Sequence, residues 1–313
     1  MKKQNIKNGK FLITIAGPTA VGKTELTLKL AKKYDAEIFS ADSRQLYKEL
    51  TIGTAKPGKE ELDQVTHHFI NHISIHDPYN VARYEEEIDV LFNSYFLKKD
   101  VGILTGGTGM YIKAALEGLD HFPAVDPEVI QEYQYLFESN GIEILQEEIR
   151  QKDPSYAQQV DMSNSRRLIR ALSVIKSSGQ AYSSFLGRKK EKLHPFQTIQ
   201  ICLTRDREEL YNRINKRVDQ MIENGLIEEA ESVWKFKELK SLQTVGYSEL
   251  FDFFDGKHSK EEAIALIKRN SRRYAKRQMT WFRNQGEWNY LDASDIEAII
   301  EFINSKMESI NEK

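Results

Sequence analysis

A strand-to-helix junction near the N-terminus constrains the fold of this chain more than any other feature. Residues 11–16 form an apolar, β-branched run that predicts a buried strand, and residues 23–33 have the apolar spacing of a helix. Between them, Gly17-Pro-Thr-Ala-Val-Gly-Lys-Thr24 matches the pattern G-x-x-x-x-G-K-[ST]. Because such a loop wraps phosphate oxygens at the start of a helix, the junction predicts a phosphate-binding loop on an α/β framework.

Each part of this loop has a chemical task. The glycines let backbone N–H groups curl around phosphate oxygens, and the helix N-terminus adds partial positive charge. Lys23 supplies a point charge, and the hydroxyl of Thr24 can hold Mg²⁺. The predicted phosphate-binding residues are Gly17, Pro18, Thr19, Ala20, Val21, Gly22, Lys23 and Thr24. The motif indicates a polyphosphate ligand and does not specify a nucleotide.

Further apolar runs alternate with helical stretches, which is typical of a doubly wound parallel sheet. Strands are predicted over 37–41, 101–105 and 198–203, with a helix over 85–96. After residue 205 the chain is mostly helical, over 208–224, 227–236 and 260–284. The fold class expected is therefore an α/β fold with a P-loop NTPase-like parallel sheet.

Residues 121–197 interrupt this alternation with an all-helical insertion. Helices are expected over 128–139, 142–151 and 163–177, and no convincing strand lies among them. The predicted organisation is a core domain from 1–120 and 198–313, with a helical insertion domain at 121–197 between its two parts.

Composition excludes several classes of protein. The 313 residues carry 45 Lys and Arg against 47 Asp and Glu, which rules out a small, uniformly basic nucleic-acid-binding domain. A hydrophobic content of 40% rules out an acidic disordered chain. The single Cys202 lies in an apolar run and excludes a disulfide framework or a Cys-rich zinc site. With no signal peptide and no apolar stretch of 18 residues, we expect a cytoplasmic protein that makes no membrane contact.

Local charge is far from neutral. Residues 126–161 hold nine acidic and two basic residues, whereas 162–192 hold eight basic residues and one acidic residue. Residues 265–286 hold seven basic residues and no acid, with Tyr274, Trp281 and Phe282 interleaved. RNA phosphates would meet this charge and the aromatic rings could stack on bases. Alternatively, the helix packs on the core through Ile264, Ile267, Tyr274 and Met279 while its charges are solvated.

Two polar loops follow the second and third predicted strands. Asp42 is expected at the carboxyl edge of the sheet, near the phosphate loop, where it would act as a general base or an outer metal ligand. A cap or turn role is the alternative, but the polar run Asp42-Ser-Arg-Gln45 in one loop favours a functional role. After the third strand, Thr108 offers a hydroxyl, and Gly106, Gly107 and Gly109 would allow a ligand to approach the backbone closely.

Two groups of arginines also have two interpretations. Arg166 and Arg170 share a helix face, with Arg167 beside them, and would be either solvated or bound to an anion. Arg205, Arg213 and Arg217 would either close over phosphates or form surface ion pairs with Glu208, Glu209 and Asp219.

Together these segments resemble the bacterial tRNA dimethylallyltransferases, also called tRNA isopentenyltransferases. The matching motifs run in family order over about residues 11–290. They are Gly17-Pro-Thr-Ala-Val-Gly-Lys-Thr24, Asp42-Ser-Arg-Gln-Leu-Tyr47, Gly53-Thr-Ala-Lys56, His67-His68, Gly106-Gly-Thr-Gly-Met-Tyr111, Asn164-Ser-Arg-Arg-Leu-Ile-Arg-Ala-Leu172, Arg213-Ile-Asn-Lys-Arg-Val-Asp219, Val245-Gly-Tyr-Ser-Glu-Leu250 and Arg277-Gln-Met-Thr-Trp-Phe-Arg283.

The resemblance implies transfer of a dimethylallyl group from dimethylallyl diphosphate to the exocyclic N6 amine of the adenosine 3′ of the tRNA anticodon. The phosphate loop would then hold the diphosphate leaving group, with Lys23 and Mg²⁺ on Thr24 stabilising its charge. Asp42 would take the proton of the attacking amine, and Thr108 would also be catalytic. We add Arg205, Arg213 and Arg217 as a diphosphate clamp.

The resemblance also implies contacts to the anticodon stem-loop of tRNA. The residues that correspond are Asp42, Ser43, Arg44, Gln45, Thr108, Arg166, Arg167, Leu168, Ile169, Arg170, Gln243, Thr244, Val245, Gly246, Tyr247 and Ser248. A monomer is expected. Three alternatives are a small-molecule kinase using ATP, a non-catalytic RNA-binding protein, and a prenyltransferase acting on free adenine nucleotides.

Overall fold

The computed structural model describes residues 9–188, 192 and 194–312. The chain divides into two compact units. One comprises Met1–Leu116 and Leu193–Lys313, and the other is Glu117–Lys192. The helical unit thus begins and ends a few residues before the predicted limits at 121 and 197.

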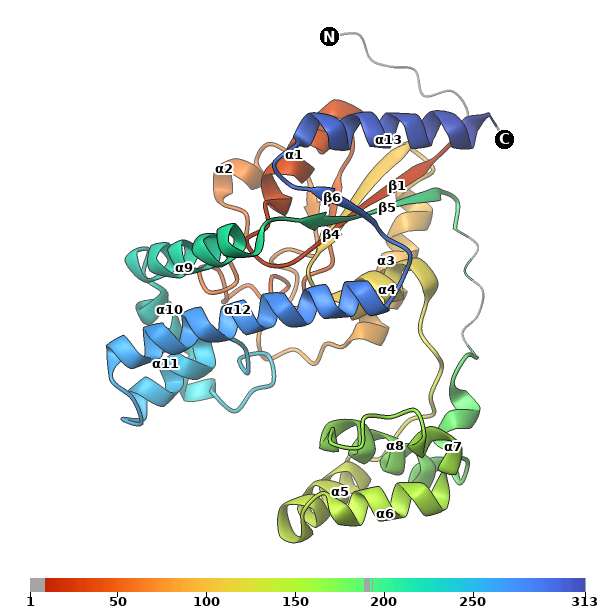
Figure 1. The fold of residues 1–313 in the computed structure, drawn as a ribbon, viewed down its shortest axis with the longest axis vertical. Helices are drawn as coiled ribbons and strands as arrows, with labels where there is room; N and C mark the ends of the chain where they lie inside the picture. Colours follow the sequence, from red (N-terminus) through yellow and green to blue (C-terminus); the bar gives the residue numbers. More distant parts are fainter. Residues whose placement is uncertain (1–8, 189–191, 193, 313) are drawn as a thin grey trace. The chain divides into compact units, whose positions relative to one another are not determined.

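A six-stranded parallel sheet forms the centre of the larger unit (Figure 1). The strand order is β3-β2-β4-β1-β5-β6. The strands are β1 (Phe11–Ala16), β2 (Ile38–Ser40), β3 (His67–His68), β4 (Val101–Gly106), β5 (Gln197–Thr204) and β6 (Asn289–Asp292). The predicted α/β class with a parallel sheet is confirmed.

The sheet is buried on both faces, as its continuous apolar strands require. Along β1, Phe11, Ile13 and Ile15 pack in one core cluster, whereas Leu12 and Ala16 pack in the other. Every residue of β1 is buried. The residues that follow β1 therefore start from a rigid backbone at the centre of the sheet.

The helices of the larger unit cover the sheet. They are α1 (Lys23–Tyr34), α2 (Lys59–Leu62), α3 (Val81–Tyr95), α4 (Gly109–Glu117), α9 (Arg207–Glu223), α10 (Leu226–Val233), η2 (Trp234–Phe236), α11 (Tyr247–Phe254), α12 (Lys260–Asn284) and α13 (Ile296–Asn311). Residues of α1 and α13 join the cluster of Phe11, while residues of α3, α4 and α10–α12 join that of Leu12.

The described part of the smaller unit contains helices and no strand. Its elements are α5 (Pro127–Asn140), α6 (Glu143–Lys152), α7 (Pro154–Ala157), α8 (Ser165–Ser178) and η1 (Tyr182–Phe185). Leu145, Ile149, Leu168 and Leu172 are fully buried or nearly so and form its own core. The basic stretch of α8 is therefore one face of an amphipathic helix.

Several short or exposed elements lack a clear signal in the sequence. Strand β3 has only two residues, and the edge strand β6 is largely exposed, so neither shows the apolar run of a central strand. Helices α2, α4, α7, α11 and α13 are also absent from the prediction. The four predicted strands and the three predicted helices of the insertion lie within a few residues of their observed limits. Cys202 is buried, as expected.

Among the residues described, we find no helix that is both long and apolar enough to cross a membrane.

The crossing of two loops at Gly106 gives a test of this fold. A Cβ atom at Gly106 would lie 2.3 Å from the carbonyl oxygen of Ala41, which is backbone and cannot move aside. Gly106→Ala should lower the free energy of unfolding by about 3 kcal/mol, measured by urea denaturation. Gly58→Ala, whose Cβ would first meet Glu61 at 3.8 Å, is the matched control. Equal midpoints for the two variants would contradict the crossing.

Candidate active site at the carboxyl edge of the sheet

The phosphate loop leaves β1 and enters α1 in a conformation that needs glycine at both ends. Gly17 has a φ of 145° and Gly22 a φ of 117°. The ammonium group of Lys23 donates to the carbonyl oxygens of Gly17 (2.9 Å) and Pro18 (2.8 Å), across the hollow of the loop. The loop is therefore preformed around one positive charge.

Burial lowers the pKa of Lys23 to about 8, and two charged neighbours act on it as well. Asp42 raises the pKa and Arg217 lowers it. These effects place a carboxylate and a guanidinium within electrostatic reach of the loop lysine. A bound anion would stabilise the charged form of Lys23.

Asp42 and the phosphate loop line the same cavity, which has a volume of about 50 Å³. Lys23 and Thr24 form one side, and Asp42, Gln45 and Thr105 contribute others. The edge of the parallel sheet thus brings the cationic loop and the candidate base together.

Asp42 also shapes its own turn. Its Oδ1 accepts hydrogen bonds from the backbone N–H groups of Arg44 (2.9 Å) and Gln45 (3.3 Å). The turn role and the cavity-facing role that the sequence left open are therefore both present. These hydrogen bonds fix the orientation of the Asp42 carboxylate.

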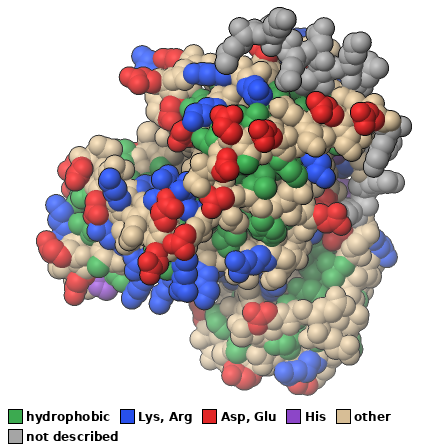
Figure 2. Space-filling view, turned by 45° about the horizontal axis from the view of Figure 1, so that its top comes forward, with side chains coloured by type: hydrophobic (Ala, Val, Ile, Leu, Met, Phe, Trp, Pro, Cys, Tyr) green, Lys and Arg blue, Asp and Glu red, His purple; other side chains and the backbone are tan. Residues whose placement is uncertain are grey.

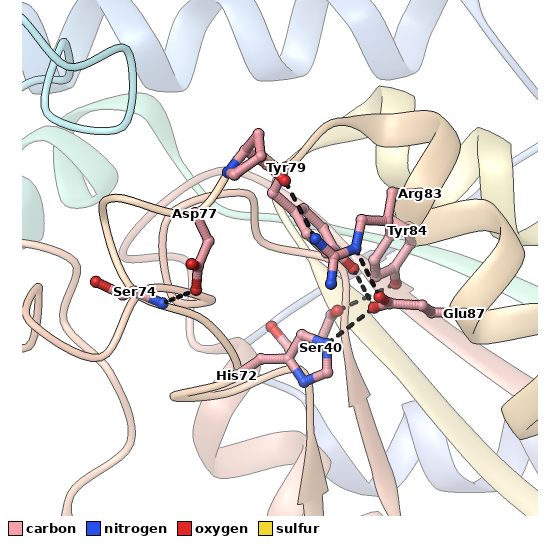
Figure 3. Close-up of polar contacts among 9 residues, drawn as sticks. Ser40, His72, Ser74, Asp77, Tyr79, Arg83, Tyr84 and Glu87 are labelled. Atoms are coloured by element: carbon pink, nitrogen blue, oxygen red, sulfur yellow. Dashed lines mark hydrogen bonds and ion pairs between the residues drawn. The ribbon is translucent and has the colours of Figure 1, made fainter.

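Polar side chains of α3 hold the end of β2, which precedes Asp42, and the loop after β3 (Figure 3). The hydroxyl of Tyr84 donates to the carbonyl oxygen of Ser40, the last residue of β2, at 3.0 Å. Three groups converge on the carboxylate of Glu87, one turn further along α3. They are the Tyr79 hydroxyl (2.7 Å), the Arg83 guanidinium (2.9 Å) and the His72 ring (2.8 Å). The Glu87 contacts therefore tie the loop after β3 to α3, while Tyr84 separately ties α3 to the end of β2.

Thr108 lies directly beside this turn. Its Oγ1 accepts a hydrogen bond from the backbone N–H of Ser43 (3.1 Å), and its own N–H donates to Ala41 O (3.3 Å). The hydroxyl of Tyr274, on α12, interacts with the Thr108 side chain. Burial and the charge of Asp42 raise the pKa of Tyr274 to about 12, so its hydroxyl stays protonated at neutral pH.

The sequence did not predict that Tyr274 lies at this site. The sequence indicates base stacking or core packing for it, because nothing in its local sequence separates those roles from a place beside Asp42. Its spacing from Gln278 and Trp281, at i, i+4 and i+7, is the available signal.

The three glycines at and just after the end of β4 pack closely against other parts of the chain, and Gly106 also lines the cavity. A Cβ would lie 2.3 Å from Ala41 O at Gly106, 2.1 Å from Gln278 Nε2 at Gly107, and 2.2 Å from the Trp281 ring at Gly109. The loop 106–109 is therefore packed between the Asp42 loop and α12.

The three candidate clamp arginines have different roles in the structure. Arg205 donates to the carbonyl oxygen of Val21 (3.3 Å) and pairs with Glu209, and Arg213 donates to that of Ala20 (2.9 Å). Both brace the phosphate loop from outside through its carbonyl oxygens. Arg217 is half-buried and lies near Asp42, which opposes the lowering of its pKa by burial. Of the three, Arg217 is the one whose charge lies within electrostatic reach of both Asp42 and Lys23.

Several residues predicted to contact RNA hold loops together. Arg44 donates to the carbonyl oxygens of Lys240 (3.2 Å) and Ser241 (3.0 Å), and Gln45 donates to those of Thr54 and Ala55 (3.2 Å each). These side chains are partly exposed, so their bonds do not remove them from the surface.

Tyr247 is the clearest departure from the predicted RNA contacts. Its side chain is fully buried, and its hydroxyl donates to Glu229 at 2.6 Å. Glu229 also accepts from the backbone N–H groups of residues 51–53, at 2.8–3.0 Å. Tyr247 is therefore a core residue here. In the same segment Gln243 and Ser248 are exposed, Thr244 and Val245 are half-buried, and Gly246 is buried.

In the helical unit, the basic face of α8 lines a hollow. Arg166, Arg167 and Arg170 line it together with Tyr156 and Tyr182. Leu168 and Ile169, on the same helix, are buried and cannot present their side chains to RNA, which corrects their predicted role. Arg170 also lies over the ring of Phe122, 5.8 Å from its centroid.

Helix α12 combines the two interpretations of its charge. Lys268 pairs with Asp219 (2.5 Å), and Arg272 donates to Asn215 (2.6 Å). Five further cations of this helix are exposed: Arg269, Arg273, Lys276, Arg277 and Arg283. Figure 2 shows Lys and Arg side chains gathering in groups among Asp and Glu side chains on one face of the molecule. The inner side of α12 packs on the core through Ala263, Ile267 and Phe282.

For a divalent metal, the chain supplies few ligands. Within the described ranges no group of three His, Cys, Asp or Glu side chains could hold an ion. The exposed Thr24 and the Asp42 carboxylate line one cavity. Such a donor set suits Mg²⁺ only when substrate phosphates and water complete its shell.

The chain is similar to known proteins over most of its length. The IPP transferase family model matches residues 45–285. The chain is 50% identical over 301 residues to the tRNA dimethylallyltransferase of Christiangramia forsetii, covering 96% of this chain and 99% of that protein. It is 46% identical over 300 residues to the enzyme of that name from Cytophaga hutchinsonii, covering 96% and 98%.

Solved structures give the same answer. The tRNA isopentenylpyrophosphate transferase of Bacillus halodurans matches with a TM-score of 0.72 and 37% identity, covering 97% of this chain and 99% of that one. A eukaryotic dimethylallyltransferase acting on tRNA matches with a TM-score of 0.75 and 27% identity, covering 92% and 75%. This chain therefore belongs to the IPP transferase family.

Proposed function

We propose that this protein transfers the dimethylallyl group of dimethylallyl diphosphate to the N6 amine of the adenosine 3′ of a tRNA anticodon, releasing diphosphate. The observation that carries this assignment is the shared cavity of the phosphate loop and Asp42. The positively charged side of this cavity suits an anionic leaving group. The side with Asp42 supplies a carboxylate that can accept a proton.

The reaction exchanges one bond for another. The bond between the allylic carbon and the diphosphate oxygen breaks with its electron pair on oxygen, and the adenine nitrogen forms a bond to that carbon. The nitrogen then gives a proton to the carboxylate of Asp42. Lys23, the loop amides and Arg217 oppose the charge that develops on the leaving oxygen.

The other predicted residues support this chemistry. Thr108 holds the Asp42 turn through the N–H of Ser43 and has a hydroxyl near the acceptor side. Arg205 and Arg213 keep the loop carbonyls turned outward, which leaves loop N–H groups for the diphosphate.

Mg²⁺ is the divalent cation we propose for this site, held by the Thr24 hydroxyl and by diphosphate oxygens. When bound, it would neutralise charge on the leaving group. Thr24 is exposed at the start of α1, and the anionic ligands come mostly from the substrate.

We propose that tRNA contacts the chain through two basic surfaces. One is the face of α8 with Arg166, Arg167 and Arg170, and the other is the exposed cations of α12. Ser43, Arg44 and Gln45, together with the exposed Gln243 and Ser248, would add further contacts. Since one chain supplies every group in the mechanism, we infer a monomer, working in the cytoplasm with its tRNA.

The direct test supplies labelled dimethylallyl diphosphate with unmodified tRNA, with AMP, or with tRNA whose target adenosine is replaced by guanosine. Label should appear only in the unmodified tRNA, with one diphosphate released per label. Label in AMP alone would assign the chain to the transferases of free nucleotides and overturn the proposal.

The variant Asp42→Asn removes the proposed general base but keeps the turn that Asp42 forms. The amide oxygen of the new side chain can still accept the N–H groups of Arg44 and Gln45, so the turn should survive. Turnover should fall about 100- to 1000-fold, because a general base contributes on this order. Pyrophosphate affinity, measured by calorimetry, should stay within about 3-fold. Asp63→Asn, at an exposed carboxylate, is the control. Turnover near that of the control would remove Asp42 as the base.

The variant Lys23→Met tests whether the charge of Lys23 binds the diphosphate, through the pH dependence of pyrophosphate affinity. Because the pKa of Lys23 is about 8, its charge is present at pH 7 and mostly lost by about pH 9.5. The ratio of wild-type to variant pyrophosphate affinity should be largest near pH 7 and should shrink as the lysine loses its proton. Lys29→Met, at an exposed lysine of the same helix, should show a ratio near one throughout. A ratio for Lys23→Met that does not change with pH would contradict the assignment.

A further inference from the structure

One stripe of side chains on α12 packs against the loop that follows β4. Tyr274, Gln278 and Trp281 lie at i, i+4 and i+7 on one side of the helix. Tyr274 meets Thr108, Gln278 meets Gly107, and the Trp281 ring fills the place of a side chain at Gly109. The helix thus holds loop 106–109 at three successive points.

Gln278 differs from its neighbours because it also reaches the phosphate loop. Its Oε1 accepts the backbone N–H of Thr19 (3.0 Å), and its Nε2 donates to the carbonyl oxygen of Gly107 (2.9 Å). The side chain is only 6% exposed. Both polar ends of a buried carboxamide are therefore satisfied, each by a different loop.

The position of this bridge matters because the two loops separate just before it. Strands β1 and β4 pair as far as Ala16 and Gly106, which are register partners. Beyond that pair the β1–β4 ladder ends, and the Gln278 carboxamide joins Thr19 to Gly107 instead. Thr108, the next residue, holds the Asp42 turn.

The bridge also changes which amides of the phosphate loop can meet a ligand. The N–H of Thr19 is already donated to Gln278. The amides left for phosphate oxygens are those toward the start of α1. Gln278 thus fixes the near end of the loop and leaves its helix end for the leaving group.

We propose that Gln278 is a positioning residue that sets the distance between the diphosphate loop and the Thr108–Asp42 side of the site. This inference rests on the proposed function, since the distance matters only if a group passes from one side to the other. A displacement of about 1 Å between reacting groups lowers turnover on the order of 100-fold.

The first experiment replaces the bridge with a side chain of similar size. Gln278→Met keeps the volume and loses both hydrogen bonds. We expect turnover to fall about 10- to 100-fold, while KM for tRNA and pyrophosphate affinity change by less than about 3-fold. Asn284→Met, at an exposed amide near the end of the same helix, should keep wild-type kinetics.

Gln278→Glu adds a signature that a purely structural role would not produce. Its carboxylate could accept from Thr19 but would repel the Gly107 carbonyl oxygen, whereas the protonated acid could donate to it. Burial raises the pKa of a carboxyl group. The activity of this variant, relative to wild type, should therefore recover as the pH falls from about 8 to about 6, while that of Gln278→Met should not.

A double-mutant cycle tests whether Gln278 acts through Gly107. A Cβ at Gly107 would lie 2.1 Å from Gln278 Nε2, so Gly107→Ala alone should expel the carboxamide. Gly107→Ala, Gln278→Ala and the double variant should then have similar turnover, rather than the much lower turnover that independent effects would give. Additive effects would contradict the bridge.

The outcomes separate the two levels of inference. If wild-type protein fails to prenylate tRNA, the proposed function is overturned, and this inference with it. If wild type is active and folded Gln278→Met retains turnover within about 2-fold, only the positioning role is overturned. Unfolding curves for every variant show that the measured protein is folded.

Discussion

The buried parallel sheet is the constraint on which the rest of the structure depends. Its ladder stops at nearly the same level on four strands, at the register pairs of Ala16 with Gly106, Ala16 with Cys202, and Ser40 with Thr105. The phosphate loop, the Asp42 turn and the Thr108 loop therefore all begin at one edge. No long-range attraction between the loops is needed to gather them, because the hydrogen-bond register has already done so.

Charge at this edge is balanced against burial. Lys23 and Arg217 are both disfavoured in their charged forms by burial, and Asp42 favours both. The site thus holds more positive charge than one carboxylate neutralises, in surroundings where desolvation is already costly. An anionic ligand that replaces the missing counter-charge would relieve this cost, which supports the proposed binding of a diphosphate in this cavity.

The sequence predicted what local pattern determines and missed what tertiary contact determines. The loop 17–24 and the four central strands have strong local signals, and so do the amphipathic helices of the insertion. The bonds of Arg205 and Arg213 to the carbonyls of Val21 and Ala20 have none, since they join residues nearly two hundred positions apart. Tyr247 matched a family motif, yet only the packed structure shows that its hydroxyl is buried on Glu229.

The two sides of α12 differ in what they contact. The cations on its outer side are exposed to solvent, while the side chains on its inner side pack against loop 106–109. If RNA binds the outer side as we propose, substitutions there would change RNA affinity and leave the packing on loop 106–109 intact. The proposed RNA contact and the packing on loop 106–109 thus lie on separate sides of a single helix, so the first could vary without altering the second.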